Sequence, residues 1–424
     1  MIDEDNIKKY EKMYNSDNTS ELEAFYGLPK EVKFCKKCVI SNQRPNSTVE
    51  FKHNIKSKKE TIHFDKDGVC DACRLAEKKD KEIDWKQREE ELWKLCDKFR
   101  REDGRYDCLV PGSGGKDSVK QSWLLKYKFN MHPLTVTWAP HMYTTYGWDN
   151  FINWIHKGGF DNILFTPNGK VHRLLTRLAY INLLHPFQPF IFGQKNIGVR
   201  FALKYDIPLV FYGENEAEYG NPIQDTVTAL RSEKYHTGKD YKNMFLGGVS
   251  VKDIIEKYGL SMNDLLPYLP VDPDEVEKAK IQVHYLGYYI KWDPQEAYYF
   301  AVDKVGFKAN DQRTEGTYSK YNSIDDKTDP FHYWTTLIKF GIGRATYDAA
   351  QEIRNHKITR EEGVALVKKF DQEFPKRYFQ EFLDYLDMAE KEFFEIADKF
   401  RSPHLWKKEK GEWKLRHTVW EIDN

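Results

Sequence analysis

Apolar runs of strand length alternate with segments of helical periodicity through the middle of the chain. Four such runs are present: 108–110, 134–138, 162–165 and 207–212. Between them, apolar residues recur at helical spacing in three segments: about 148–157, 170–184 and 195–205. Strands that alternate with helices indicate an α/β fold, so we predict a parallel sheet with helices on both faces.

The segments on either side of this α/β pattern have a different character. Residues 77–104 are charged, with apolar positions at helical spacing, and predict an amphipathic helix that leads into the sheet. Helical signals dominate after about residue 250. We therefore expect three parts: an N-terminal region over 1–104, an α/β domain over 105–250, and a helical C-terminal domain over 251–424 that completes the active site.

All six cysteines lie within the first 108 residues, and four of them form two C-x-x-C pairs. The pairs are Cys35/Cys38 and Cys70/Cys73, with 31 residues between them. In a reducing compartment this spacing indicates metal ligands, and four thiolates in a tetrahedron suit a structural Zn²⁺ ion. We predict a zinc ribbon over about 30–76. Four unrelated buried cysteines, or a redox or iron–sulfur role, are the alternatives.

A glycine-rich loop joins the first predicted strand to the helix that follows. It reads SGGKDS, and its glycines let backbone N–H groups approach an anion at a helix N-terminus. The spacing differs from the G-x-x-x-x-G-K-[ST] loop of many nucleotide hydrolases. We expect six residues to form a phosphate site: Ser113, Gly114, Gly115, Lys116, Asp117 and Ser118. The alternative is a glycine-rich turn with a serine at the helix N-cap.

The SGGKDS loop resembles the PP-loop of ATP pyrophosphatases. This resemblance implies that ATP is cleaved between its α and β phosphates and that AMP is transferred to an oxygen of the substrate. Asp117 is expected to orient the loop or to bind Mg²⁺ that bridges the phosphates, unless it only caps the helix. Trp138 ends the second predicted strand in a segment similar to the one that borders the nucleotide in PP-loop proteins. We expect Trp138 either to contact the adenine ring or to be an ordinary aromatic residue of the core.

Five downstream segments indicate which group of PP-loop proteins the chain resembles. They are 212–220, 286–294, 315–318, 324–327 and 338–346. In this order, and with the two C-x-x-C pairs, they resemble the N-acetyl sugar amidotransferases over about 30–390. That family converts an acetamido group on a sugar into an acetamidino group, in bacterial surface-polysaccharide (lipopolysaccharide O-antigen) and flagellin-sugar pathways. The absence of cysteines after Cys108 agrees with nitrogen chemistry, because sulfur-transferring relatives need a cysteine there.

The family resemblance also implies that ammonia comes from another protein. No cysteine of this sequence stands in a glycine-rich elbow suited to a glutaminase, so ammonia comes either from solution or from a partner protein, and the resemblance favours the partner. We therefore expect a separate glutaminase subunit, together with a barrel protein similar to that of the histidine pathway as the ammonia conduit. The predicted zinc ribbon over about 30–76, called the zinc module from here on, is the docking surface we expect for these partners.

Four more residues are candidates for the chemistry. Glu214 and Asn215 directly follow the fourth predicted strand and are expected to bind Mg²⁺, hydrogen-bond the sugar amide or guide ammonia, unless they form a plain turn. Lys339 and Arg344 flank a glycine-bearing turn and are expected to neutralise phosphate charge, unless they are surface ion-pair partners. The acidic pair at 325–326 is either a second Mg²⁺ site or a helix cap.

Charge and composition limit the other functions. Lys and Arg total 66, as do Asp and Glu, and a formal net charge of zero argues against a broad nucleic-acid-binding surface. An apolar run long enough for a membrane helix is absent, and the acidic start lacks the features of a signal peptide, so we expect a cytoplasmic protein without membrane insertion. The competing hypotheses are a tRNA-modifying PP-loop adenylase with a zinc ribbon and a non-catalytic zinc-ribbon scaffold.

Overall fold

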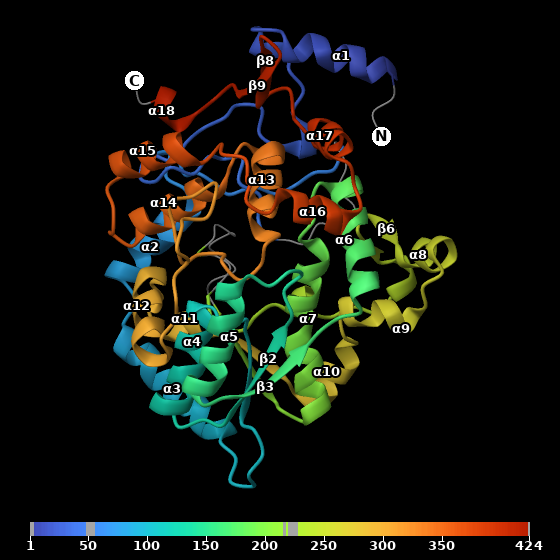
Figure 1. Ribbon diagram of the computed structural model, residues 1–424. Coiled ribbons are helices and arrows are strands. Elements are labelled where there is room, and N and C mark those ends of the chain that lie inside the picture. The colour runs from blue at the N-terminus through green and yellow to red at the C-terminus, as the bar shows by residue number, and fades with distance from the viewer. Residues whose placement is uncertain (1–3, 48–55, 215–217, 219–227, 423–424) are drawn as a thin grey trace.

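The computed structural model describes residues 4–47, 56–214, 218 and 228–422, and its centre is a five-stranded sheet. The strands follow the order β3–β2–β1–β4–β7 in space, and all of these pairings are parallel (Figure 1). Their bounds are Cys108–Pro111 (β1), Pro133–Trp138 (β2), Asp161–Phe165 (β3), Leu209–Tyr212 (β4) and Gln282–Tyr285 (β7). The predicted parallel α/β fold is confirmed.

The strand order reverses between β1 and β4. Strands β2 and β3 lie on one side of β1, whereas β4 and β7 lie on the other, and Leu109 pairs with Val210 across the junction. In open parallel sheets, ligands bind beyond the carboxyl ends of the strands at such a switch point. The loops that follow Pro111 and Tyr212 therefore lie where a binding site is expected.

Alternate residues of β1 enter two separate cores. Leu109 packs with helices α6 (Gly169–Leu183) and α7 (Gln188–Tyr205), while Cys108 and Val110 pack with α3 (Trp85–Phe99). This division follows from the two-residue period of a strand, which sends neighbouring side chains to opposite faces. Helices thus cover both faces of the sheet, as predicted.

Two boundaries differ from the sequence predictions. Strand β7 belongs to the sheet although it lies beyond residue 250, where we placed the end of the α/β domain, so the sheet extends to Tyr285. The single helix predicted over 77–104 is two helices, α2 (Asp71–Lys81) and α3. The side chain of Asp84 accepts hydrogen bonds from the first backbone N–H groups of α3, and this cap starts a new helix.

The two ends of the chain share one hydrophobic core. Tyr10 and Tyr14 of α1 (Glu4–Tyr14) are buried with aromatic residues of α13 (Asp329–Phe340), α16 (Phe379–Leu386) and α17 (Glu390–Asp398). Figure 1 shows α1 beside the C-terminal hairpin of β8 (Trp406–Glu409) and β9 (Glu412–Leu415), and α1 is in contact with β8. The N-terminal region and the C-terminal helices therefore pack as one unit rather than as separate modules.

The remaining elements complete the helical layers around the sheet. The helices are α4 (Lys116–Trp123), α5 (Thr145–Gly158), α8 (Val251–Tyr258), α9 (Met262–Leu265), α10 (Pro273–Ala279), α11 (Leu286–Tyr289), α12 (Pro294–Val305), α14 (Arg344–Arg354), α15 (Arg360–Phe370) and α18 (Val419–Ile422). The short strands are β5 (Phe245–Leu246), β6 (Val249–Ser250), β8 (Trp406–Glu409) and β9 (Glu412–Leu415). In the part of the chain that the structure describes, none of the helices has the length and apolar character to cross a membrane.

Candidate active site

The glycine-rich loop lies between β1 and α4, at the switch point of the sheet. Gly114 has a φ of +85°, and a Cβ there would be 2.6 Å from the Phe151 Cα, so only glycine fits. The hydroxyl of Ser118 accepts a hydrogen bond from the Ser113 N–H at 3.1 Å and closes the loop. Gly115 is the N-cap of α4, so the N-terminus of this helix begins in the loop. Such a loop fits a bound phosphate group.

A cavity of about 560 Å³ lies against this loop. Most of its lining residues come from four parts of the chain: the loop Ser113–Asp117, the zinc-module segments within 40–47 and 59–72, the residues within 184–195 that lead from α6 into α7, and residues within 321–354. Glu214, which follows β4, also lines it. The α/β sheet, the zinc module and the C-terminal helices therefore meet at one site.

Charged groups are concentrated at the floor of the cavity, where β1 and β4 end. The Lys116 ammonium lies 2.5 Å from a carboxylate oxygen of Asp117, whose other oxygen accepts a hydrogen bond from the indole N–H of Trp292 at 3.2 Å. Burial acts to lower the pKa of Lys116, but the charges of Asp117 and Glu214 outweigh it and raise the pKa. The Lys116 side chain thus stays cationic, as binding of phosphate oxygens requires.

Glu214 is a carboxyl group whose pKa is matched to proton transfer near neutral pH. Burial raises its pKa to about 8, the nearby carboxylate of Asp117 adds to this effect, and Lys116 opposes it. A group that gains and loses a proton near the working pH can serve as a general base or acid. Its place beyond β4 agrees with the sequence prediction that it belongs to the site.

Substitution of Glu214 by glutamine tests this burial through the pH dependence of stability. Because folding raises the pKa of Glu214 from 4.5 to about 8, its contribution to stability is fully present below pH 4.5 and is lost as the pH rises through 8. Glutamine stays neutral. We expect Glu214→Gln to gain stability relative to the wild type as the pH rises over this range, in urea unfolding without nucleotide. Glu90→Gln on the exposed side of α3 should follow the wild-type curve, and parallel curves for all three proteins would refute the assignment.

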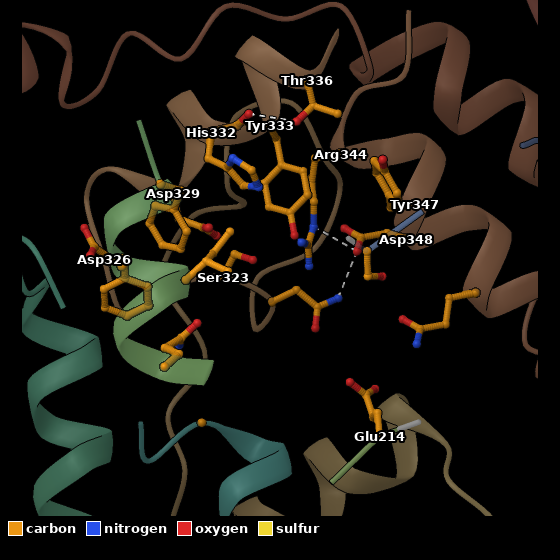
Figure 2. A pocket seen from close by; sticks show the side chains of 18 of the residues that line it. Glu214, Ser323, Asp326, Asp329, His332, Tyr333, Thr336, Arg344, Tyr347 and Asp348 are labelled. Atoms are coloured by element: carbon orange, nitrogen blue, oxygen red, sulfur yellow. Dashed lines mark hydrogen bonds and ion pairs between the residues drawn. The ribbon is translucent and has the colours of Figure 1, made fainter. Parts of the chain in front are cut away.

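An ion pair projects into the cavity from the opposite wall. Arg344 and Asp348 lie one helical turn apart on α14, with the guanidinium Nε 3.0 Å from a carboxylate oxygen. Figure 2 shows this pair facing the cavity, with Glu214 on the far side. The Arg344 guanidinium also lies 4.3 Å from the ring centre of Tyr333, and Thr317 donates a 2.6 Å hydrogen bond to Asp348. These contacts hold Arg344 in a fixed orientation.

The structure separates the two cations that the sequence analysis grouped together. Arg344 is close enough to Lys116 for their charges to interact across the cavity. Lys339 also lines the cavity, but its ammonium donates to the carbonyl of Leu183 at the end of α6, at 3.0 Å, and is 2% exposed. Arg344 therefore fits the predicted role beside the phosphates, whereas Lys339 holds two helices together.

Two other candidate residues have different outcomes. Trp138 is 4% exposed and packs in the hydrophobic core against Phe165 and Tyr268, with Gly193 directly on its indole ring. It is a core residue and not part of the cavity wall, so the predicted contact with adenine is not supported. Asn215 lies outside the described residues, and its role stays a prediction.

The acidic pair at 325–326 is divided between two tasks. Asp326 accepts hydrogen bonds from the backbone N–H groups of His141 at 2.6 Å and Thr328 at 2.8 Å, which ties the start of α13 to the segment after β2. Both residues line the cavity. Burial raises the pKa of the Asp325 carboxyl, and the side chain of Ser113 in the loop opposes this effect. Asp326 is thus a structural link, while Asp325 lies near the glycine-rich loop.

Sequence reasoning missed several residues of the cavity wall. Asp329, at the start of α13, has a carboxylate oxygen without a hydrogen-bond partner, and burial raises its pKa to about 6. Asp348 was missed although its spacing of four residues from Arg344 is the usual spacing of a helical ion pair. Arg44 and Arg354 carry no sequence signal, because neither belongs to a motif.

The four predicted zinc ligands converge in the structure. The sulfur atoms of Cys35, Cys38, Cys70 and Cys73 all lie within 4.8 Å of one another, and all four residues are buried. The Cys35–Cys73 and Cys38–Cys70 sulfurs are 3.9 and 3.8 Å apart. Sulfurs at tetrahedral corners with Zn–S bonds of about 2.3 Å are separated by about 3.8 Å, so the cluster fits a zinc ion.

The cysteine cluster packs directly against the C-terminal helices. Its hydrophobic surroundings include Ala349 and Ala350 of α14 and Val367 of α15. Arg360 of α15 donates to the carbonyl oxygens of Cys38 and Cys35 at 3.2 and 3.3 Å. Because residues from both the zinc module and α14 line the cavity, the cluster helps to hold the cavity wall in place.

The fold and the site define an α/β protein with a glycine-rich loop at the switch point of its sheet and a four-cysteine cluster beside it. Residues 315–419 match the family described as LPS biosynthesis protein WbpG-like, C-terminal domain, and these residues contain α14 and much of the cavity wall.

Two individual proteins are also similar to this chain. Uncharacterized protein MJ1599 of Methanocaldococcus jannaschii is 37% identical over 91 residues, which cover 20% of this chain and 29% of that relative. The chain therefore matches less than a third of the length of the curated relative. A solved structure of NMN synthetase from Francisella tularensis has a TM-score of 0.30 and 10% identity, over 73% of this chain and 98% of the other.

Proposed function

We propose that this protein is an ATP-dependent amidotransferase that converts the acetamido group of an N-acetylated sugar into an acetamidino group. One observation carries the proposal: the SGGKDS loop and Glu214 face, in a single cavity, the wall formed by the segment that matches the WbpG-like lipopolysaccharide-biosynthesis domain. The loop suits a phosphate group, and the family description points to a sugar pathway. The sequence resemblance to N-acetyl sugar amidotransferases supports the same reaction.

The proposed reaction overcomes the low reactivity of an amide carbon. The acetamido oxygen attacks the α-phosphorus of ATP, the bond to the β-phosphate oxygen breaks, and pyrophosphate leaves. Ammonia then attacks the carbon of the resulting O-adenylyl imidate and loses a proton, after which the C–O bond breaks and AMP leaves. Neither step needs a covalent bond to the protein, so positioning and charge stabilisation account for catalysis.

Each charged group at the floor of the cavity has a role in this scheme. The loop and Lys116 bind the β and γ phosphates, and Arg344 stabilises the charge on the transferred phosphate from the opposite wall. Asp117 is the carboxylate we assign to Mg²⁺, which when bound would neutralise phosphate charge. Glu214, with a pKa of about 8, accepts the proton that ammonia releases.

Ammonia has to reach the cavity from another source under this proposal. We infer a separate glutaminase subunit, with a barrel protein as conduit, on the resemblance given above. The burial of the cysteine cluster against α14 and α15 favours a supporting role for zinc at the cavity wall. Docking of the partners on the zinc module remains part of the proposal.

Mass spectrometry tests the reaction directly. The protein is incubated with ATP, Mg²⁺, ammonium labelled with heavy nitrogen, and a panel of N-acetylated nucleotide sugars and nonulosonic acids. We expect AMP and pyrophosphate to form together with a sugar in which labelled NH has replaced oxygen. AMP that forms only after addition of tRNA would favour the tRNA-modifying adenylase, and the absence of AMP with every sugar would contradict the proposal.

A further inference from the structure

Arg44 is a buried cation without a partner for one of its donors. It lies in the zinc module, is 6% exposed and lines the cavity. Its position is fixed from both sides, because its N–H donates to the Ser41 carbonyl and its carbonyl accepts from Ile62. The guanidinium Nη1 has no hydrogen-bond partner. A buried guanidinium donor left unpaired costs free energy, which an acceptor in the cavity would recover.

A second guanidinium and a tyrosine complete this part of the wall. Arg354, at the end of α14, lines the same cavity, and its charge is close enough to act on that of Arg44. Arg354 donates to the backbone carbonyl of Glu218 at 3.2 Å. The Arg44 guanidinium lies 5.2 Å from the ring centre of Tyr347, which also lines the cavity. Two neighbouring cations beside a hydroxyl group form a site suited to an anion.

The cysteine cluster offers a competing explanation for these cations. Four thiolates around a zinc ion leave a net negative charge, and the charges of both Arg44 and Arg354 interact with those of the cysteines. Arg354 and the cluster-bound Arg360 already lie on the α14 and α15 side of the cluster. Charge compensation therefore accounts for Arg354, but it leaves the buried Nη1 of Arg44 without an acceptor.

We propose that Arg44, together with Arg354 and Tyr347, forms a subsite for an anionic group of the acceptor sugar, either a phosphate or a carboxylate. The subsite lies where the zinc module meets α14, apart from the glycine-rich loop that binds the phosphates of ATP. The identity of the ligand as a sugar rests on the proposed function, whereas binding of the anion can be measured without turnover.

Calorimetric titration with the glycine-rich loop occupied tests this subsite. The zinc-loaded protein is saturated with Mg²⁺ and α,β-methylene-ATP and titrated with UDP-N-acetylglucosamine, N-acetylneuraminic acid and neutral N-acetylglucosamine. We expect one of the two anionic probes to bind more tightly than the neutral sugar, and the probe that does so identifies phosphate or carboxylate as the ligand. Arg44→Met should lower the affinity for that probe by about tenfold or more, while Arg44→Lys should lower it less.

Arg360→Met is the matched control, because Arg360 contacts the carbonyls of Cys35 and Cys38 but does not line the cavity. We expect it to leave probe affinity unchanged, with zinc content measured in every variant. Anionic probes that bind no tighter than the neutral sugar, or equal losses in Arg44→Met and Arg360→Met, would overturn the subsite. Loss of probe affinity in Arg44→Met alone, in a protein that forms no AMP, would keep the subsite and reject the amidotransferase.

Discussion

Replacement of Gly114 by alanine is expected to abolish binding of α,β-methylene-ATP and to reduce AMP formation by about 100-fold or more. The φ of +85° disfavours any residue with a Cβ, and the added carbon would lie 2.6 Å from the Cα of Phe151 in α5. The backbone of a packed helix cannot move away easily. The loop itself must therefore shift, so its N–H groups no longer point at the phosphates.

Gly104→Ala separates this collision from the conformational cost of alanine. Gly104 has a similar φ of +79°, but nothing lies within 4 Å of the position of its Cβ. We expect Gly104→Ala to lose about 1–2 kcal/mol of stability and to keep nucleotide binding. Calorimetry with the analogue and thermal unfolding are measured for both variants. Wild-type analogue affinity in Gly114→Ala would show that this loop does not bind the phosphates.

The features that the sequence predicted are those whose cause is local. The SGGKDS loop needs only a strand, two glycines and a helix start, all within a few residues of Gly114. The spacing of the cysteines likewise encodes two metal-binding turns. Strand β7 was missed because its alternation of polar and apolar residues spans only the four residues Gln282–Tyr285. This segment becomes a strand by pairing with the edge of β4.

The cavity wall could be predicted only in part, because its members come together through tertiary packing. Arg44 has no sequence pattern, and its role follows from burial between the zinc module and α14. Trp138 shows that the face of the sheet on which a side chain lies predicts its environment better than its position at a strand end does. It shares a face with Leu134 and Val136, four and two residues earlier, and this face packs against α7. Side chains of β2 on this face therefore enter the hydrophobic core rather than the cavity.

Replacement of Cys70 by serine is expected to remove zinc from the protein and to lower its unfolding temperature by about 10 °C or more. Cys70 is fully buried, is the N-cap of α2, and donates its N–H to the sulfur of Cys35 at 3.4 Å. Serine is a poor zinc ligand, so the remaining three cysteines would hold the ion weakly. The hydrophobic contacts of the cluster with α14 and α15 would loosen with it.

The loss of zinc should also disturb the cavity wall, because Arg44, Ile62 and Ala72 of the zinc module line the cavity. We expect Cys70→Ser to lose affinity for the anionic sugar probe more than for α,β-methylene-ATP, whose loop lies on the sheet. Cys96→Ser is the control, since Cys96 is also fully buried but lies outside the cluster, and it should keep zinc and probe affinity. One zinc per chain in Cys70→Ser would show that Cys70 is not needed to hold the metal. Equal destabilisation of the two variants would show that the cluster stabilises the protein no more than an ordinary buried cysteine does.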